Sequence, residues 1–329
     1  MIDLLPVLQT ATKTIRKSME QWFSSYPAGM PWTIVSDYCI DDKEKKNDVF
    51  SFVVIANHDK AENIMKYISA VAPLDIKKVQ RVPLGLMQYL TCPQPVTFSV
   101  SFVIERESAL LRDYLRVEDM SDFIPYVCEL VESFDRNSPA SEAIDPMYFR
   151  EVTKRLRIFA KELARKQPNA KLARQIHLAS TFAATMFYLI TQSTQAGYLR
   201  WISDRDKLVE HGDTVVYDLA HVYFILMMAS QPEVKEAEPD EQGRVILDLP
   251  KVLFELPDKT GEHRFDALIR LADYLAGTLA DLGPDFSYSK QKFGEMLDGV
   301  FVDSSTNCIV QMLSNGERIT GRYAPIRSS

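Results

Sequence analysis

Three aspartates occupy positions where an α/β protein can assemble a catalytic site. Asp37 lies near the end of the apolar run TIVSDY, and Asp204 follows the apolar run in RWISDRD. Asp273 lies on an amphipathic helix predicted over residues 268–283, where leucines recur at helical spacing. Because ligands in open α/β folds gather beyond the carboxyl ends of strands, we expect these three carboxylates to meet there.

Three carboxylates brought together repel one another unless cations lie between them. Mg²⁺ suits such a cluster because it takes hard oxygen ligands and keeps several waters beside a phosphate substrate. Two such ions about 3.5 to 4 Å apart activate water and stabilise the leaving oxygen in phosphodiester cleavage. The sequence therefore predicts a Mg²⁺ or Mn²⁺ site that contains Asp37, Asp204 and Asp273.

Two further acids are candidates for the same site. Glu105 ends the predicted strand FSVSFVIE and is the fourth candidate catalytic residue. Asp206 competes with Asp204 as a metal ligand, because alternate residues of a strand share one face. The structural alternative for each acid is a cap on a following helix or turn.

Small residues follow Asp273 on the same side of its helix. Ala276 and Gly277 lie three and four positions later, and a helical glycine costs about 1 kcal/mol relative to alanine. We expect these residues to let the helix approach the edge of the sheet closely. The alternative is a surface aspartate that merely neighbours small packing residues.

A strongly basic helix face is the candidate surface for nucleic acid. Residues 150–174 contain nine basic and two acidic residues. Five of the basic residues fall at successive helical positions opposite an apolar stripe: Arg150, Lys154, Arg157, Lys161 and Arg165. Such a face can position phosphates without reading bases. The alternative is a solvated face, or one paired with acidic helices elsewhere in the protein.

The surrounding pattern predicts a mixed α/β sheet with helices on its faces. Short β-branched and aromatic runs alternate with longer helical segments, and SNGE at 314–317 indicates a tight hairpin. We expect an N-terminal helix within residues 1–30 and a main domain over 31–289 that carries a helical insertion at about 108–196. Residues 290–329 are expected to add a helix and a β-hairpin to the same domain.

The composition narrows the class of protein. A chain of 329 residues that is 46% hydrophobic can bury a sizeable core, and its net charge of −7 argues against a general polyanion binder. The widely spaced cysteines, Cys39, Cys92, Cys128 and Cys308, predict reduced thiols in a cytoplasmic protein. The N-terminus does not resemble a secretion signal, the apolar run at 221–230 is too short to cross a bilayer, and no membrane partner is expected.

The segments around the three aspartates, above all IRLADYLAG, resemble the bacterial domain-of-unknown-function 3800 family. Members of that family show an early strand ending in Asp-Glu-Ser-Gly, a later strand ending in Asp, and a helix that opens with a Gln-Leu-Ala-Asp type of motif. Here Arg270 stands where Gln is usual, and Asp37 is followed by Tyr-Cys-Ile. The segment PLDIKKVQRVPLGLMQYL lies where members commonly carry another acid before a helix, and it offers no clear equivalent. The resemblance spans residues 31 to 285.

The resemblance implies an RNase H-like fold and a metal-dependent nuclease that acts on DNA or RNA, of the kind associated with phage defence and mobile elements. It implies that Asp37, Asp204 and Asp273 bind the metal. The missing family acids favour an alternative, a catalytically degenerate protein that acts as a nucleic-acid-binding or protein-interaction subunit, with a protein partner or a second copy of the chain. A weaker alternative reads Asp204 to Asp206 as the DxD motif of a nucleotide-sugar transferase.

Overall fold

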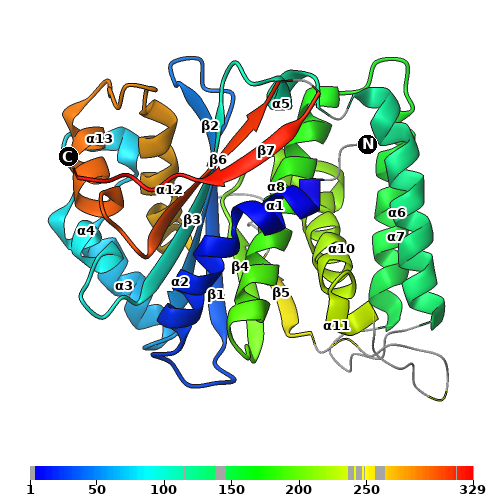
Figure 1. Ribbon diagram of the computed structural model, residues 1–329, viewed down its shortest axis with the longest axis horizontal. Coiled ribbons are helices and arrows are strands. Elements are labelled where there is room, and N and C mark those ends of the chain that lie inside the picture. Colours follow the sequence, from blue (N-terminus) through cyan, green and yellow to red (C-terminus); the bar gives the residue numbers. More distant parts are fainter. Residues whose placement is uncertain are drawn as a thin grey trace.

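One mixed β-sheet organises the molecule (Figure 1). The computed structural model describes residues 4–114, 116–137, 146–235, 249–255, 264–315 and 317–328, together with residues 241 and 247. Within this part of the chain, seven strands form a sheet in the order β5-β4-β1-β2-β3-β6-β7. The strands are β1 (Trp32–Cys39), β2 (Asn47–Ala56), β3 (Thr97–Glu105), β4 (Tyr198–Ser203), β5 (Lys251–Glu255), β6 (Asn307–Ser314) and β7 (Ile319–Tyr323).

The strand directions combine two kinds of pairing. β1, β2 and β3 form an antiparallel meander, and β4 and β5 are added parallel to β1 at one side. At the other side β6 runs parallel to β3 and turns back into the antiparallel β7. The prediction of a mixed α/β sheet flanked by helices is therefore confirmed, and the last hairpin extends this same sheet.

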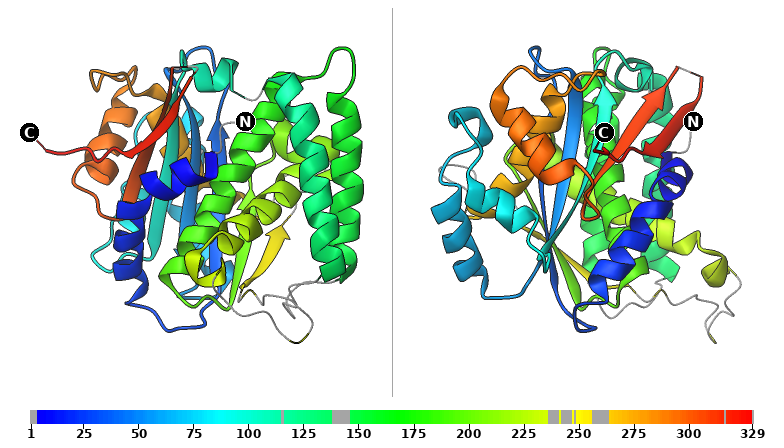
Figure 2. Two further views of the ribbon diagram at one scale, coloured as in Figure 1. Left: turned by 45° about the vertical axis from the view of Figure 1, so that its right-hand side comes forward. Right: turned by 60° about the vertical axis from the view of Figure 1, so that its left-hand side comes forward.

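Helices cover both faces of the sheet (Figures 1 and 2). One layer contains α3, α4, α12 and α13, and the other contains α1, α2, α8 and α10, with the α6 and α7 pair outside α8 and α10. The helices are α1 (Leu4–Ala11), α2 (Lys13–Phe23), α3 (Ala61–Val71), α4 (Leu84–Leu90), α5 (Ala109–Arg112), α6 (Val117–Asn137), α7 (Pro146–Leu163), α8 (Ala170–Ser193), α9 (Lys207–Glu210), α10 (Val215–Ala229), α11 (Pro232–Lys235), α12 (Asp266–Asp281) and α13 (Gln291–Met296). Short helical turns are η1 (Ile76–Lys78), η2 (His211–Asp213) and η3 (Leu297–Phe301).

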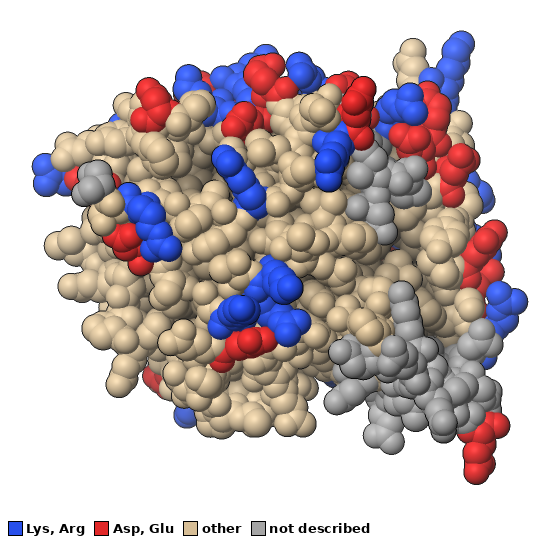
Figure 3. Space-filling view, in the orientation of Figure 1, with Lys and Arg blue, Asp and Glu red and all other residues tan. Residues whose placement is uncertain are grey.

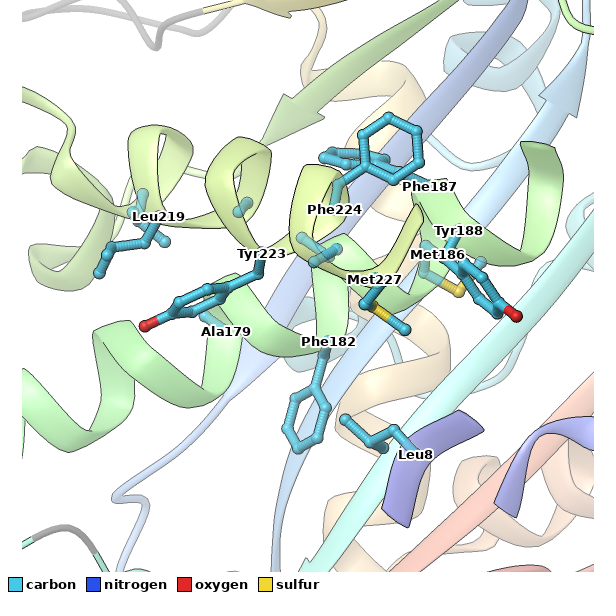
Figure 4. Packing of buried hydrophobic residues seen from close by; sticks show 14 of the residues in the cluster. Leu8, Ala179, Phe182, Met186, Phe187, Tyr188, Leu219, Tyr223, Phe224 and Met227 are labelled. Atoms are coloured by element: carbon cyan, nitrogen blue, oxygen red, sulfur yellow. The ribbon is translucent and has the colours of Figure 1, made fainter. Parts of the chain in front are cut away.

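Alternation along the strands divides the buried side chains between two cores. Ile34 and Tyr38 of β1 face α8, whereas Val35 and Cys39 face α12. Figure 4 shows the first core between α8 and α10, where aromatic and methionine side chains fill the space. Phe182 of α8 stacks on Phe102 of β3 with ring centroids 4.3 Å apart. Both helices are apolar on most sides because the α6 and α7 pair encloses them.

Some sequence expectations need correction. The helix predicted near the N-terminus is divided at Thr12, whose hydroxyl donates to the Leu8 carbonyl at 2.7 Å, a bond that often bends helices. The pattern after Gly299 predicts a strand, but Leu297–Phe301 form the π-helical turn η3. The pattern VILDLP at 245–250 predicts a short extended segment, of which residues 245, 246 and 248 lie outside the described residues.

Two further observations bear on the composition analysis. All four cysteines are free thiols, as the sequence predicts. Among the described helices, none combines the length and the apolar character needed to cross a bilayer.

Candidate active site

Asp37 and Asp204 lie side by side on neighbouring parallel strands. Ser36 of β1 is paired with Ser203 of β4, and the Asp204 backbone N–H donates to the Ser36 carbonyl at 3.0 Å. The next residue on each strand is the aspartate, and neighbouring strands are about 4.8 Å apart. Because Asp37 lies between Val35 and Cys39, both carboxylates belong to the face covered by α12.

Asp273 reaches the same region from α12. Its Oδ2 accepts the backbone N–H of Ile76 in η1 at 2.8 Å. The charge of Asp273 also acts on Asp37. The structure thus pairs Asp37 with Asp204 at two strand ends, and α12 brings Asp273 near enough for its charge to act on Asp37.

Burial and mutual repulsion both raise the pKa values of these acids. Burial, followed by the charges of Asp273 and Asp204, raises the pKa of Asp37 well above its usual value. A side-chain hydrogen bond also joins Asp37 to Asp204. Two carboxyl groups can share such a bond only when one carries a proton, and the raised pKa of Asp37 means that this pair keeps a proton to a higher pH than an isolated aspartate does.

Asp273 is less strongly perturbed. Burial raises the pKa of Asp273 to about 6, while the hydrogen bond from Ile76 and the charge of Lys77 act in the opposite direction. Lys77 lies in η1, in the segment where the sequence offered no family acid. Sequence reasoning missed this lysine, because only the packing of η1 against α12 brings it near the acids.

Two of the aspartates, Asp37 and Asp204, are suited to bind a hard divalent cation. Within the described residues, no three His, Cys, Asp or Glu side chains lie close enough together to hold a metal ion. Mg²⁺ is usually bound by one or two carboxylates, with waters and substrate phosphates as its other ligands. Asp37 and Asp204 meet that requirement, and Asp273 would act through its charge.

The close approach expected at Gly277 is real, but its partner differs from the expectation. A Cβ atom on Gly277 would lie 2.8 Å from Cγ2 of Ile76. The element that approaches the helix is therefore η1, and not the edge of the sheet. Lys292 holds the same segment by donating to the carbonyls of Ile76 and Val79 at 2.5 and 2.9 Å. Asp273 therefore anchors η1 in addition to facing Asp37.

Glu105 does not join the aspartates. In the strand register Asp37 is level with Ser51, and Ser51 is level with Ser101. Glu105 is two strands away and four residues further along, where it accepts a hydrogen bond from Gln311 of β6 at 2.9 Å. Its expected catalytic role is not supported by this position.

Asp206 also has a different role. Its side chain accepts the backbone N–H of Leu208 at 2.9 Å and caps α9. Its charge acts on Tyr38, whose side chain lies on the opposite face of the sheet from Asp37. The expected strand alternation fails here because the chain leaves β4 after Ser203. This placement separates Asp206 from Asp204 and weakens the DxD alternative.

The basic face of α7 is largely engaged by neighbouring acids. Arg150 contacts Asp135 at 3.2 Å, and Arg157 pairs with Glu132, both acids of α6. Lys154 lies 3.8 Å from Glu151 of its own helix. Lys161 and Arg165 are exposed.

The place of α7 in the fold also separates it from the aspartates. α7 lies on the far side of the sheet from α12, at the right of Figure 1. Figure 3 shows acidic and basic groups mixed over that side of the molecule. Arg150, Lys154 and Arg157 are thus paired with acids, as the alternative interpretation of this face proposes. The basic face also lies far from Asp37, Asp204 and Asp273.

The chain matches no protein-family model, no curated protein and no solved structure. The functional argument therefore depends on the geometry of the described residues.

Proposed function

We propose that the protein is a Mg²⁺- or Mn²⁺-dependent nuclease of RNase H-like type that hydrolyses phosphodiester bonds of DNA or RNA. The observation that carries the proposal is the pair of Asp37 and Asp204 on adjacent parallel strands, with the charge of Asp273 on α12 acting on Asp37. The β1 to β3 meander with β4 and β5 added in parallel beside β1 is the sheet expected of an RNase H-like fold.

The side chains divide the chemistry among them. Asp37 and Asp204 would hold the cation and give up their shared proton on binding it. A bound Mg²⁺ would supply a lowered pKa for water and neutralise charge on the phosphate. Asp273 uses Oδ2 for the Ile76 N–H, which leaves Oδ1 to accept a proton, and a pKa of about 6 suits a general base near neutral pH.

The test is cleavage of labelled single- and double-stranded DNA and RNA with Mg²⁺ or Mn²⁺. We expect Asp37→Asn and Asp204→Asn to lower the rate by at least about 100-fold, because each removes a ligand of the cation, and loss of groups that merely support metal ligands already costs up to about 100-fold. Glu105→Gln is the matched control and should cleave at the rate of the natural protein. Circular dichroism should show that each variant is folded.

The outcomes separate clearly. Equal cleavage by the natural protein and both aspartate variants would refute the site. Loss of cleavage in Glu105→Gln would show that Glu105 is a catalytic residue.

A second candidate is a nucleic-acid-binding or protein-interaction subunit without catalysis. One observation favours it: Asp273 is tied to the Ile76 N–H and contributes to holding η1, a purely structural task. Absence of cleavage with every substrate, together with no thermal stabilisation by Mg²⁺ or Mn²⁺, would favour this candidate over the nuclease.

A further inference from the structure

A cavity of about 220 Å³ opens where the loop between β1 and β2 meets the first turns of α8. Its lining is dominated by cations, namely Lys43, Arg106, Arg112, Lys171 and Arg174. Asp41 and Asp48 are the acids of the lining. None of the three aspartates of the candidate active site lines it.

Arg174 is the buried cation of this cavity, with 9% of its surface exposed. Its Nε donates to the Tyr114 carbonyl at 2.6 Å and its Nη1 to the Leu111 carbonyl at 2.5 Å. Its Nη2 makes no hydrogen bond to any described residue, and Asp113 acts on it only through charge. A buried guanidinium without a carboxylate partner is costly unless an anion joins it.

Arg106 is oriented in a similar way. Its Nη1 donates to the carbonyls of Asp42, Lys43 and Lys45 at 3.2, 2.6 and 3.2 Å. These partners are all neutral backbone groups of the β1 to β2 loop. They fix the position of the guanidinium, whose charge acts on Asp48 without an ion pair between the two.

The acids of the lining are already engaged. Asp41 is bound by Lys171 at 2.6 Å and by the Gln175 amide at 2.6 Å. Asp48 accepts the backbone N–H of Asp41 at 3.1 Å. Arg112 contacts Glu107 at 3.5 Å. Lys43, Arg106 and Arg174 remain as the cations of the lining that make no ion pair or hydrogen bond with an acid among the described residues, although Asp48 and Asp113 act on Arg106 and Arg174 through charge.

The backbone adds to the positive potential. Lys171, Arg174 and Gln175 lie in the first two turns of α8, a helix of 24 residues. The N-terminal end of a helix carries a partial positive charge and favours anions. Figure 3 shows lysine and arginine side chains, mixed with acidic ones, along the upper edge of the molecule, where Figure 1 places the β1 to β2 loop.

We propose that this cavity binds a phosphoryl group. The planar fork of a guanidinium matches phosphate oxygens in two parallel hydrogen bonds, and two such groups, Arg106 and Arg174, line the same space. The group comes either from a small phosphate compound or from the backbone of a nucleic acid. The proposal goes beyond the nuclease activity and does not depend on it.

A nucleic-acid source would connect the cavity to the candidate active site. Asp41 follows Asp37 by four residues along the β1 direction. Four extended residues span at most about 14 Å. A nucleic-acid chain bound at the cavity would therefore pass the carboxyl end of β1 within a few nucleotides of the aspartates.

The test measures binding of two probes to the full chain in EDTA, so that the aspartates and their cation do not enter the result. Calorimetry uses inorganic phosphate, and fluorescence anisotropy uses a single-stranded DNA oligonucleotide without terminal phosphates. Arg106→Gln and Lys43→Gln test the exposed part of the cavity, and Arg174→Lys tests the buried fork while keeping its charge. Lys66→Gln on α3 is the control, because it removes an exposed charge on the other layer.

We expect at least about a tenfold loss of affinity in Arg106→Gln and Arg174→Lys, and no change in Lys66→Gln. If the arginine variants lose binding of inorganic phosphate, the phosphoryl group comes from a small phosphate compound. If they lose binding of the oligonucleotide alone, it comes from a nucleic acid. Binding of neither probe, or binding that is equal in all variants, would overturn the proposal. Cleavage assays with Mg²⁺ remain a separate readout of the aspartates.

Discussion

Asp37 occupies a position where its own negative charge destabilises the fold. Because its pKa is raised well above the usual value, the folded protein binds a proton more tightly than the unfolded chain. At neutral pH we expect Asp37→Asn to stabilise the protein in EDTA by on the order of 1 kcal/mol or more, since the amide removes the repulsion. Urea unfolding measures this change.

In Mg²⁺ we expect the natural protein to become more stable than Asp37→Asn. A cation that binds the folded protein alone stabilises the natural chain and leaves Asp37→Asn unaffected. Asp206→Asn is the control: asparagine is as good an N-cap as aspartate, so stability should change little with or without Mg²⁺. A variant at position 37 that is less stable than the natural protein in EDTA would contradict the shared-proton pair.

The same sequence signal, an acid at the end of an apolar run, marks Asp37, Asp204 and Glu105, yet only two of them meet. The signal is local, whereas the separation of Glu105 depends on β2 lying between β1 and β3. The spacing of residues within β1 or β3 does not indicate which strand will lie beside it in the sheet. Asp206 fails for a different reason, because the end of β4 is set by the helix that Asp206 itself caps.

At the scale of elements, the contact of η1 with α12 depends on the missing side chain of Gly277. Gly277→Ala would place a Cβ 2.8 Å from Cγ2 of Ile76 and push η1 away from the helix. Overpacking of this kind costs about 1 to 3 kcal/mol, which exceeds the gain of about 1 kcal/mol in helix propensity. We expect a net loss of stability in urea unfolding and a weaker Ile76 to Asp273 bond.

Gly299→Ala is the comparison for this variant. Its nearest neighbour is the Met87 sulfur at 3.0 Å, at the flexible part of a side chain that can move aside. Its stability should therefore fall by less than that of Gly277→Ala. Faster exchange of the Ile76 amide hydrogen in Gly277→Ala, but not in Gly299→Ala, would locate the effect. Equal effects of the two substitutions would argue against a special contact at Gly277.

A buried ion pair joins α7 to α10, beside the contact of Tyr148 with His221. Arg155 donates to both carboxylate oxygens of Asp218, at 2.6 and 2.8 Å, and Asp218 is buried. Arg155→Ala would leave Asp218 without a partner, and we expect a loss of about 3 kcal/mol in thermal or urea unfolding.

Lys154→Ala is the matched control for Arg155→Ala, because it removes the neighbouring charge on the same helix. Its exposed pair with Glu151 at 3.8 Å contributes little, so stability should stay within about 0.5 kcal/mol. Similar losses in the two variants would contradict the importance of the buried pair.

Helical spacing predicts the basic face of α7 correctly, but it does not indicate what lies opposite that face. Arg155, whose guanidinium binds the buried carboxylate of Asp218, does not belong to the regular series that starts at Arg150. Its partner Asp218 lies inside the apolar run of α10, where a sequence pattern favours neutral residues. Such pairs follow from the packing of whole helices.

At the scale of the whole molecule, buried histidines make stability depend on pH. Burial lowers the pKa of His177 to about 3 and that of His221 to about 4. In the unfolded chain a histidine takes up its proton below a pH of about 6.5. Each of these residues therefore costs nothing above that pH, and below it destabilises the fold by about 1.4 kcal/mol per pH unit until the folded pKa is reached.

The pH prediction is tested on His221→Gln. Between pH 7 and pH 5 the natural protein should lose about 2 kcal/mol more stability than the variant. Acids with raised pKa values, such as Asp48 and Asp273 at about 6, gain stability in the same range, but their contribution cancels in the difference. An unchanged pH slope in His221→Gln would refute the prediction.

The strands and long helices of the sheet could be predicted because their apolar periods are strong, as in β1, β2, β3 and α8. The order of the strands could not, because β4 joins β1 and β6 joins β3 across long stretches of chain. The two cores explain the difference: each is assembled from alternate residues of many strands, and alternation is visible in one strand at a time.

The pairing of β4 with β1 also has a consequence for the speed of folding. β1, β2 and β3 are consecutive along the chain, whereas β4 must find β1 after the helices α5 to α8 have been synthesised and ordered. Closing so long a loop costs entropy before any contact repays it, and proteins with many distant contacts fold slowly. We therefore expect Asp37 and Asp204 to meet late in refolding, so that the response to Mg²⁺ lags behind the recovery of helix and strand signals.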